Sequence, residues 1–137
     1  MKTFLDSSSF AKRYVEEHGS NDVETICAAT TQLALSVLCV PEIISALNRR
    51  RREHTLTQRQ YETAKRHLID DVRHADIINL TPSVVESSIT ILEAGTVRTL
   101  DALHVACAAQ WGPDLFVSSD KRQIDAARHA GLVTREV

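Results

Sequence analysis

The sequence lacks the features that mark several large classes of protein. It has only three cysteines, Cys27, Cys39 and Cys107, without a CxxC or Cys/His spacing, so neither a disulfide framework nor a zinc site is expected. The sequence also contains no run of about 20 apolar residues, the length that a membrane-spanning helix needs. Asp6 stands where a signal peptide needs an apolar core. We therefore expect a cytoplasmic protein with reduced thiols and no contact with a membrane.

A strong charge of either sign and a supply of aromatic residues are also missing. Sixteen Lys and Arg against eighteen Asp and Glu leave a net charge of -2, so no overall positive field attracts nucleic acid. Three Phe, two Tyr and one Trp are too few to form a stacking platform for single-stranded bases. Any polyanion must therefore be bound by a local group of side chains.

The 137 residues contain no repeat and no linker, so one domain over residues 1–137 is expected. Helix signals are clear at Thr57–Val72, where apolar side chains recur with a helical period, and at Asp101–Trp111, which is apolar on nearly every side. Capping-box spacings occur at Thr57–Gln60 and at Ser83–Glu86, and Pro82 is placed as the first residue of a helix. Helix ends are predicted at four glycines: Gly19, Gly95, Gly112 and Gly131.

Short, continuous apolar runs lie between these helices and predict strands that are covered on both faces. They are Thr3–Leu5, Leu33–Val40, Ile77–Leu80, Leu115–Val117 and Leu132–Thr134. Strands that alternate with helices imply parallel strands with helical crossovers. The expected fold class is therefore α/β, a three-layer α/β/α domain around a parallel sheet.

Four acidic residues follow predicted strands or open predicted helices: Asp6, Glu42, Asp101 and Asp120. Ligands of an open parallel sheet bind beyond the carboxyl ends of its strands, so these side chains should meet at one edge. Each alone is explained by helix capping or by the helix dipole. Together they would repel one another unless a cation compensated, and oxygen ligands favour Mg²⁺ or Mn²⁺.

Four segments carry a resemblance to a known family: FLDSS, PEIISAL, RTLDALHVACA and FVSSDKRQIDAARHAGL. They resemble the PIN-domain family, specifically the small VapC-type toxins of bacterial toxin–antitoxin pairs. The resemblance implies a metal-dependent ribonuclease whose acidic quartet is Asp6, Glu42, Asp101 and Asp120. It also implies the strand order 3-2-1-4-5, a homodimer, and inhibition by a small antitoxin of the VapB type. Asp125 is a weak candidate for a fifth acidic position.

Several neighbouring residues have both a structural and a functional interpretation. Ser8 and Ser118 suit capping or a hydrogen bond to a metal-bound water, and His104 suits a core or orienting role better than that of a ligand. A basic rim for RNA phosphates is drawn from Lys12, Arg13, Arg98, Lys121 and Arg122. The run Arg49–Arg52 lies farther away and suits a helix C-terminus.

Two other functions remain open at this point. A haloacid-dehalogenase-like phosphatase would need a second Asp two residues after Asp6, where the sequence has Ser8. A catalytically silent binding domain would not need all four carboxylates, whose mutual repulsion costs stability.

Overall fold

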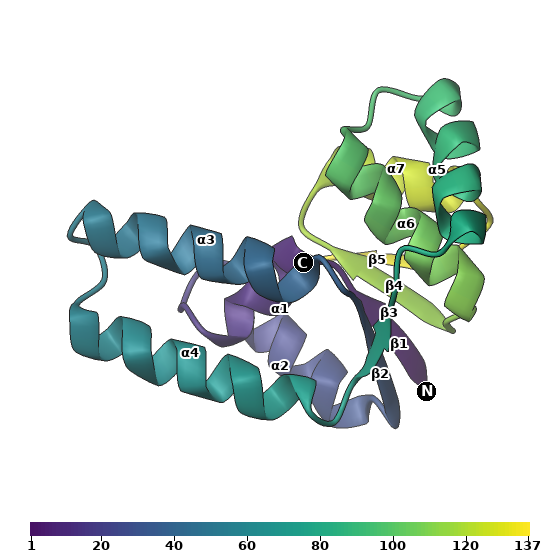
Figure 1. Ribbon diagram of the computed structural model, residues 1–137. Coiled ribbons are helices and arrows are strands. Elements are labelled where there is room, and N and C mark those ends of the chain that lie inside the picture. Colours follow the sequence, from purple (N-terminus) through teal and green to yellow (C-terminus); the bar gives the residue numbers. More distant parts are fainter.

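A five-stranded parallel sheet lies at the centre of the computed structural model, which describes all 137 residues (Figure 1). Its strand order is β3-β2-β1-β4-β5. The bounds are β1 Lys2–Leu5, β2 Gln32–Ser36, β3 Asp76–Ile78, β4 Leu115–Ser118 and β5 Thr134–Glu136. The expected α/β fold with the order 3-2-1-4-5 is confirmed.

Alternate residues of the central strands face two separate cores, because successive side chains of a strand point to opposite faces of the sheet. Phe4, Ala34 and Phe116 are fully buried on one face. The helices that cover this face are α5 (Pro82–Ala94), α6 (Thr99–Trp111) and α7 (Lys121–His129). The Phe4 and Phe116 rings stack with their centroids 5.8 Å apart.

The other face of the sheet carries Leu5, Leu35 and Val117, which are also fully buried. It is covered by α1 (Ser7–Phe10), α2 (Ser20–Ala29), α3 (Cys39–Arg52) and α4 (Gln58–Val72), with the 3-10 helix η1 (Ala11–Arg13) after α1. Helices α3 and α4 form a hairpin that extends away from the sheet in Figure 1. No helix combines the length and the apolar character that a membrane crossing requires.

Two predicted helix starts are confirmed and one is corrected. Thr57 and Gln60 form the capping box that begins α4, and Pro82 is the first residue of α5. The residue that caps α5 is Thr81, whose hydroxyl accepts from the backbone N–H of Val84, and not Ser83. An N-cap residue needs an extended backbone conformation, which Thr81 has. Ser83 follows Pro82 inside the first turn of α5, so its backbone is helical.

Three predicted strands and two glycine roles differ from expectation, and the third strand ends at Ile78 rather than at Leu80. The apolar run 33–40 is a strand only to Ser36, and its last residues begin α3 at Cys39. The last strand is shifted to Thr134–Glu136. Gly19 has the expected positive φ of 90° but precedes α2 rather than ending a helix. Gly95 ends α5 in an extended conformation, whereas Gly112 and Gly131 have the left-handed conformation predicted for them.

Candidate active site

The carboxyl edge of the sheet collects the four predicted acidic residues from four separate segments of the chain. Asp6 follows β1 and caps α1, and Asp120 follows β4 and caps α7. Glu42 lies in the first turn of α3, and Asp101 lies in the first turn of α6. Strands β1 and β4 pair with each other, so the turns that follow them are neighbours.

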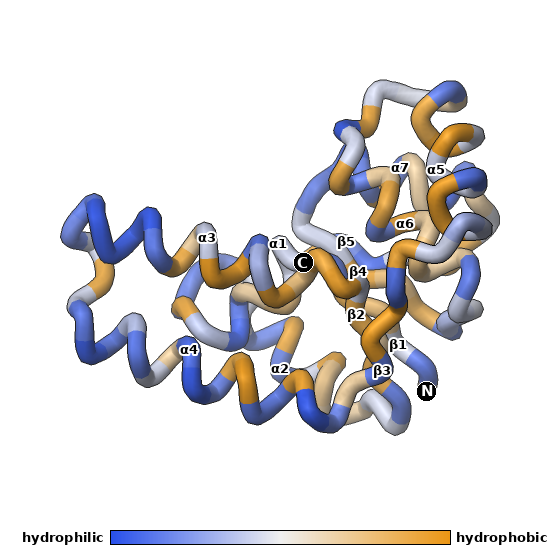
Figure 2. Tube along the Cα trace, in the orientation of Figure 1, coloured by the Kyte–Doolittle hydropathy of each residue, from blue (hydrophilic) through white to orange (hydrophobic).

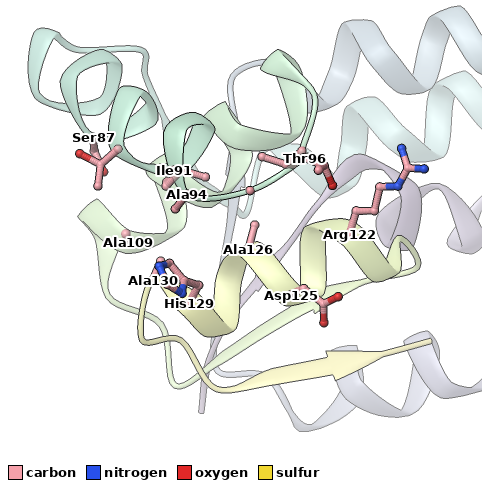
Figure 3. Close-up of a pocket in the computed structure, with 13 residues that line it drawn as sticks. Ser87, Ile91, Ala94, Thr96, Ala109, Arg122, Asp125, Ala126, His129 and Ala130 are labelled. Carbon is pink, nitrogen blue, oxygen red and sulfur yellow. The ribbon is translucent and has the colours of Figure 1, made fainter.

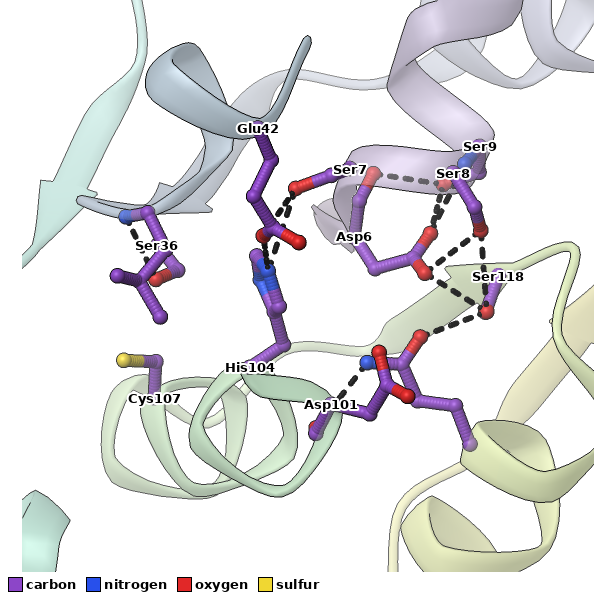
Figure 4. A network of polar contacts seen from close by, with 12 residues as sticks. Asp6, Ser7, Ser8, Ser9, Ser36, Glu42, Asp101, His104, Cys107 and Ser118 are labelled. Carbon is purple, nitrogen blue, oxygen red and sulfur yellow. Dashed lines mark hydrogen bonds and ion pairs between the residues drawn. The ribbon is translucent and has the colours of Figure 1, made fainter. Parts of the chain in front are cut away.

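Asp6 is the most buried of the four carboxylates, with 3% of the residue exposed. Its Oδ1 lies 2.9 Å from the backbone nitrogen of Ser9 and 2.7 Å from the Ser9 hydroxyl. Its Oδ2 lies 2.7 Å from Ser8 Oγ and 2.9 Å from Ser118 Oγ (Figure 4). These donors hold Asp6 in one orientation, and two of them are the Ser8 and Ser118 hydroxyls singled out in the sequence.

Glu42 is held by a histidine and a serine that arrive from different elements. Its Oε1 accepts a hydrogen bond from Ser7 Oγ at 2.8 Å and pairs with Nε2 of His104. Partial burial alone would raise the pKa of Glu42, but the hydrogen bond and charge of His104 and the Ser7 hydroxyl together lower it. Glu42 is therefore held ionised, and His104 acts as the orienting residue expected from its position one turn after Asp101.

Asp101 stands in contrast, because no hydrogen bond satisfies its carboxylate. Burial raises its pKa most, the negative charges of Asp120 and Asp6 raise it further, and the opposing effect of His104 outweighs the small contribution of Glu42. Asp120, Asp6 and Glu42 therefore lie within electrostatic reach of Asp101. A cation bound at this edge would remove the repulsion that Asp101 experiences.

The raised pKa of Asp101 predicts how pH changes stability. Since the folded-state pKa lies above the ordinary value of 3.8, ionising Asp101 costs the folded protein free energy as pH rises through this interval. In chelator, Asp101→Asn is expected to raise the melting temperature at pH 7 and to lose this advantage below about pH 4.

Thermal melts of wild type and Asp101→Asn between acid and neutral pH would measure this effect. Glu42→Gln is the matched control with the opposite sign, because the lowered pKa of Glu42 stabilises the fold above its ordinary value of 4.5. A melting temperature of Asp101→Asn below that of wild type at pH 7 would contradict the repulsion.

Two residues that sequence reasoning missed support the same edge. Ser7, directly after Asp6, bonds Glu42 and lies 3.2 Å from His104 Nε2. Gln123 is fully buried, donates to the backbone oxygen of Asp101 at 3.1 Å and lies 2.8 Å from Ser118 Oγ. A polar residue beside Ile124 on the inner face of α7 was the available signal for Gln123, whereas nothing in the spacing pointed to Ser7.

The proposed basic rim divides into residues that are free and residues that are engaged. Lys12 is only 8% exposed, and its ammonium group donates hydrogen bonds to the backbone oxygens of His18 and Val137. Arg13 pairs with Glu24 and with Asp71. The charged groups of Lys12 and Arg13 therefore stabilise the fold, and we no longer count these residues as part of the basic rim. Three basic residues remain exposed beside the acidic edge without an ion pair: Arg98, Lys121 and Arg122.

Asp125 does not extend the acidic edge. It points to the solvent side of α7, pairs with Arg128 at 3.9 Å, and lines a cavity of about 660 Å³ between α5, α6 and α7 (Figure 3). The other residues of this cavity are mainly small or apolar and include Ile91, Ala94 and Ala126. The cavity contains no second carboxylate, so it has no means of holding a hard cation.

The residues at the acidic edge fit a divalent ion by their chemistry but are not arranged around one in this conformation. All four are oxygen donors, which Mg²⁺ and Mn²⁺ prefer, and the Asp101 carboxylate has no protein partner. Yet no three His, Cys, Asp or Glu side chains are close enough together to enclose an ion.

Comparison with known proteins gives the same assignment as the fold. The family model of the PIN domain matches residues 3–129 of this chain. Ribonuclease VapC47 of Mycobacterium tuberculosis is 32% identical over 96% of this chain and 93% of its own. Ribonuclease VapC49 of the same species is 29% identical over 93% of this chain and 89% of its own.

Solved structures share the fold at lower identity. The crystal structure of VapC20 of Mycobacterium tuberculosis, described as a toxin that cleaves the sarcin-ricin loop, has a TM-score of 0.73 at 18% identity and covers 98% of this chain and 99% of its own. A toxin–antitoxin complex from Klebsiella pneumoniae has a TM-score of 0.71 at 15% identity, with the same coverage. This chain therefore belongs to the PIN-domain family, and its curated relatives are VapC ribonucleases.

Proposed function

We propose that this chain is a metal-dependent endoribonuclease and the toxin of a toxin–antitoxin pair, formed by one nuclease domain over residues 1–137. The observation that carries the proposal is the edge itself, where the fold gathers Asp6, Glu42, Asp101 and Asp120 from four distant segments. The family match and the VapC relatives support a nuclease. The Asp101 carboxylate has no hydrogen-bond partner and is repelled by its acidic neighbours, which supports binding of a cation at this edge.

In this proposal the four carboxylates hold Mg²⁺ or Mn²⁺, and the surrounding side chains orient them. A bound ion supplies a water of lowered pKa and stabilises charge on the phosphate oxygens. Ser8 and Ser118 keep Asp6 turned toward the edge, and His104 and Ser7 do the same for Glu42. Exposed cations on the rim bind the RNA backbone without reading its sequence: Arg98, Lys121 and Arg122.

The direct test is incubation of purified protein with total RNA in the presence of Mg²⁺, Mn²⁺ or chelator, followed by mapping of the RNA ends. Discrete cleavage that needs the ion is expected. Identical RNA patterns with ion and with chelator would overturn the metal-dependent mechanism, and no cleavage of any RNA would favour a silent binding domain.

A divalent ion is also expected to raise the melting temperature, because an ion that binds only the folded edge stabilises it by mass action. At a free concentration 100 times the dissociation constant the gain is about 2.7 kcal/mol. Thermal melts with and without Mn²⁺ measure it. The double variant Asp101→Asn, Asp120→Asn should lose the shift, whereas the control Asp125→Asn should keep it. An equal shift in all three proteins would place the ion elsewhere.

The phosphatase alternative is not supported by the geometry after β1. That chemistry needs a second Asp two residues beyond the first, and Ser8 instead lies 2.7 Å from the carboxylate of Asp6. Ser8 is a hydrogen-bond partner of the acidic residue and not a general acid, which leaves the nuclease as the better interpretation.

The toxin role rests on the proteins that share this fold. Several of them were solved as toxin–antitoxin complexes, among them VapBC2 from Rickettsia felis and VapBC-1 from nontypeable Haemophilus influenzae. By analogy with these complexes, we propose that a VapB-type antitoxin binds this chain and inhibits it. A homodimer stays a prediction of the resemblance, and a cytoplasmic location stays a prediction from the cysteines and the N-terminal sequence.

A further inference from the structure

The far end of the α3–α4 hairpin concentrates positive charge that the acidic edge does not use. Residues 49–59 hold five arginines and one acid, a net charge of +4 in a chain whose total is -2. We call this segment the arginine end; its basic members are Arg49, Arg50, Arg51, Arg52 and Arg59. It lies at the tip of the hairpin, away from the sheet (Figure 1), and Figure 2 shows the end of α3 as strongly hydrophilic and the turn after it as mixed.

Two of the five arginines are used to build the hairpin. Arg50 pairs with Glu17 at 3.2 Å. Arg51 donates to Asn48 at 2.6 Å and to Gln58 at 2.8 Å, and its guanidinium lies 5.1 Å from the centroid of the Tyr61 ring. The contacts of Arg51 with Gln58 and Tyr61 join α3 to the start of α4, and the Arg50–Glu17 pair joins α3 to the loop before α2.

The other three arginines have no side-chain partner. Arg49, Arg52 and Arg59 are exposed and form no ion pair or side-chain hydrogen bond. The last carbonyls of α3 are already satisfied by backbone, since Glu53, His54 and Thr55 donate their N–H groups to Arg49, Arg51 and Arg50. Helix capping therefore does not account for the free guanidinium groups.

A groove of about 710 Å³ lies between α1, η1 and α3, and its lining includes Ser8 and Ser119 as well as Arg49 and Arg50 of the arginine end. Arg52 and Arg59 lie outside this groove, and Glu17 and Glu53 also line it. Glu42 and Arg52 are ten residues apart on α3, which corresponds to about 15 Å along the helix. A stacked strand advances about 3.4 Å per nucleotide, so about four or five nucleotides span this distance.

We propose that the arginine end is a second RNA-binding site, where Arg49, Arg52 and Arg59 bind phosphates of a strand whose scissile bond lies at the acidic edge. The inference rests on the proposed nuclease function. One guanidinium group can donate two parallel hydrogen bonds to the oxygens of a phosphate, and it keeps its charge at any physiological pH. Because the rest of the chain is net negative, this end supplies the positive field that holds a strand beyond the acidic edge.

The test compares two triple variants with the same change in charge. The first is Arg49→Gln, Arg52→Gln, Arg59→Gln; the control is Lys65→Gln, Arg66→Gln, Arg73→Gln, which removes three exposed cations, two within α4 and one just after it, outside the arginine end. Both are made in Asp101→Asn protein with chelator, so that RNA is bound and not cut. The probe is a labelled single-stranded RNA of about 12 nucleotides, and its affinity is measured over a series of salt concentrations.

The arginine variant is expected to bind this RNA about tenfold more weakly and to lose about 2 from the slope of log affinity against log salt, since each phosphate contact on a single strand contributes about 0.7. The control should keep the wild-type slope. With active protein, the arginine variant should cleave a trinucleotide, too short to reach the arginine end, as fast as wild type, and the longer RNA more slowly.

Three outcomes would overturn the inference. Equal slopes for the two triple variants would show that the arginine end does not contact RNA. An equal loss of activity on the trinucleotide and on the longer RNA would show a general defect of the fold. Unchanged RNA binding with weakened binding of a co-purified acidic protein would assign the end to a protein partner. Failure of the nuclease proposal is distinct, because it appears as no cleavage by wild-type protein.

Discussion

Replacement of Asp101 by Asn is expected to reduce RNA cleavage by about 100-fold or more, the loss that follows removal of a group that stabilises charge in a transition state. The substitution keeps the shape of the side chain and removes one charge from the proposed metal site. Because the Asp101 carboxylate bonds no other residue and is repelled by its acidic neighbours, the fold should be as stable as wild type or more stable.

Cleavage of total RNA with Mn²⁺ by purified proteins of equal folded content measures this loss. Asp125→Asn is the matched control, since it removes one acidic charge from α7 outside the acidic edge and should leave activity unchanged. Cleavage by Asp101→Asn at the wild-type rate would remove Asp101 from the site.

Asp6→Asn is expected to be equally inactive but less stable. The amide nitrogen that replaces Oδ2 would face the hydroxyls of Ser8 and Ser118, which lie within hydrogen-bond distance of that oxygen, at a site only 3% exposed. Loss of hydrogen bonds to a buried charged group costs about 1 to 3 kcal/mol. The two variants thus separate loss of charge from loss of structure.

Expression of the chain alone is expected to slow growth, and co-expression of the cognate antitoxin is expected to restore it. The acidic edge attracts an inserted Arg or Lys, which can form charge-assisted hydrogen bonds with the carboxylates and so compete with metal or substrate. Asp101→Asn should make the antitoxin unnecessary, because a chain without the metal site cuts no RNA.

Growth curves at matched protein levels measure this effect, with Asp125→Asn as the variant that stays toxic. If Asp101→Asn were as toxic as wild type, the harm would not come from the acidic edge. A role in binding or as a scaffold would then be favoured over nuclease activity.

The sequence alone was sufficient to predict the architecture and the location of the acidic residues. Parallel topology follows from short apolar runs separated by helices, and the carboxyl ends of neighbouring strands then lie at one edge. Asp6 and Asp120 could be placed because Asp6 directly follows β1 and Asp120 follows β4 after one residue, positions that can be read from the local sequence. The same local logic failed at residues 37–40, since a continuous apolar run does not distinguish a strand from the start of a buried helix.

Only the tertiary structure decided which polar side chains are free and which are engaged. Lys12 follows Asp6 closely in the sequence, yet its ammonium group donates hydrogen bonds to the backbone oxygens of His18 and Val137. Ser7 and His104 are 97 residues apart and both contact Glu42. The physical reason is that a charge or hydroxyl is satisfied by whatever packs against it, and packing joins segments that have no regular spacing in the chain.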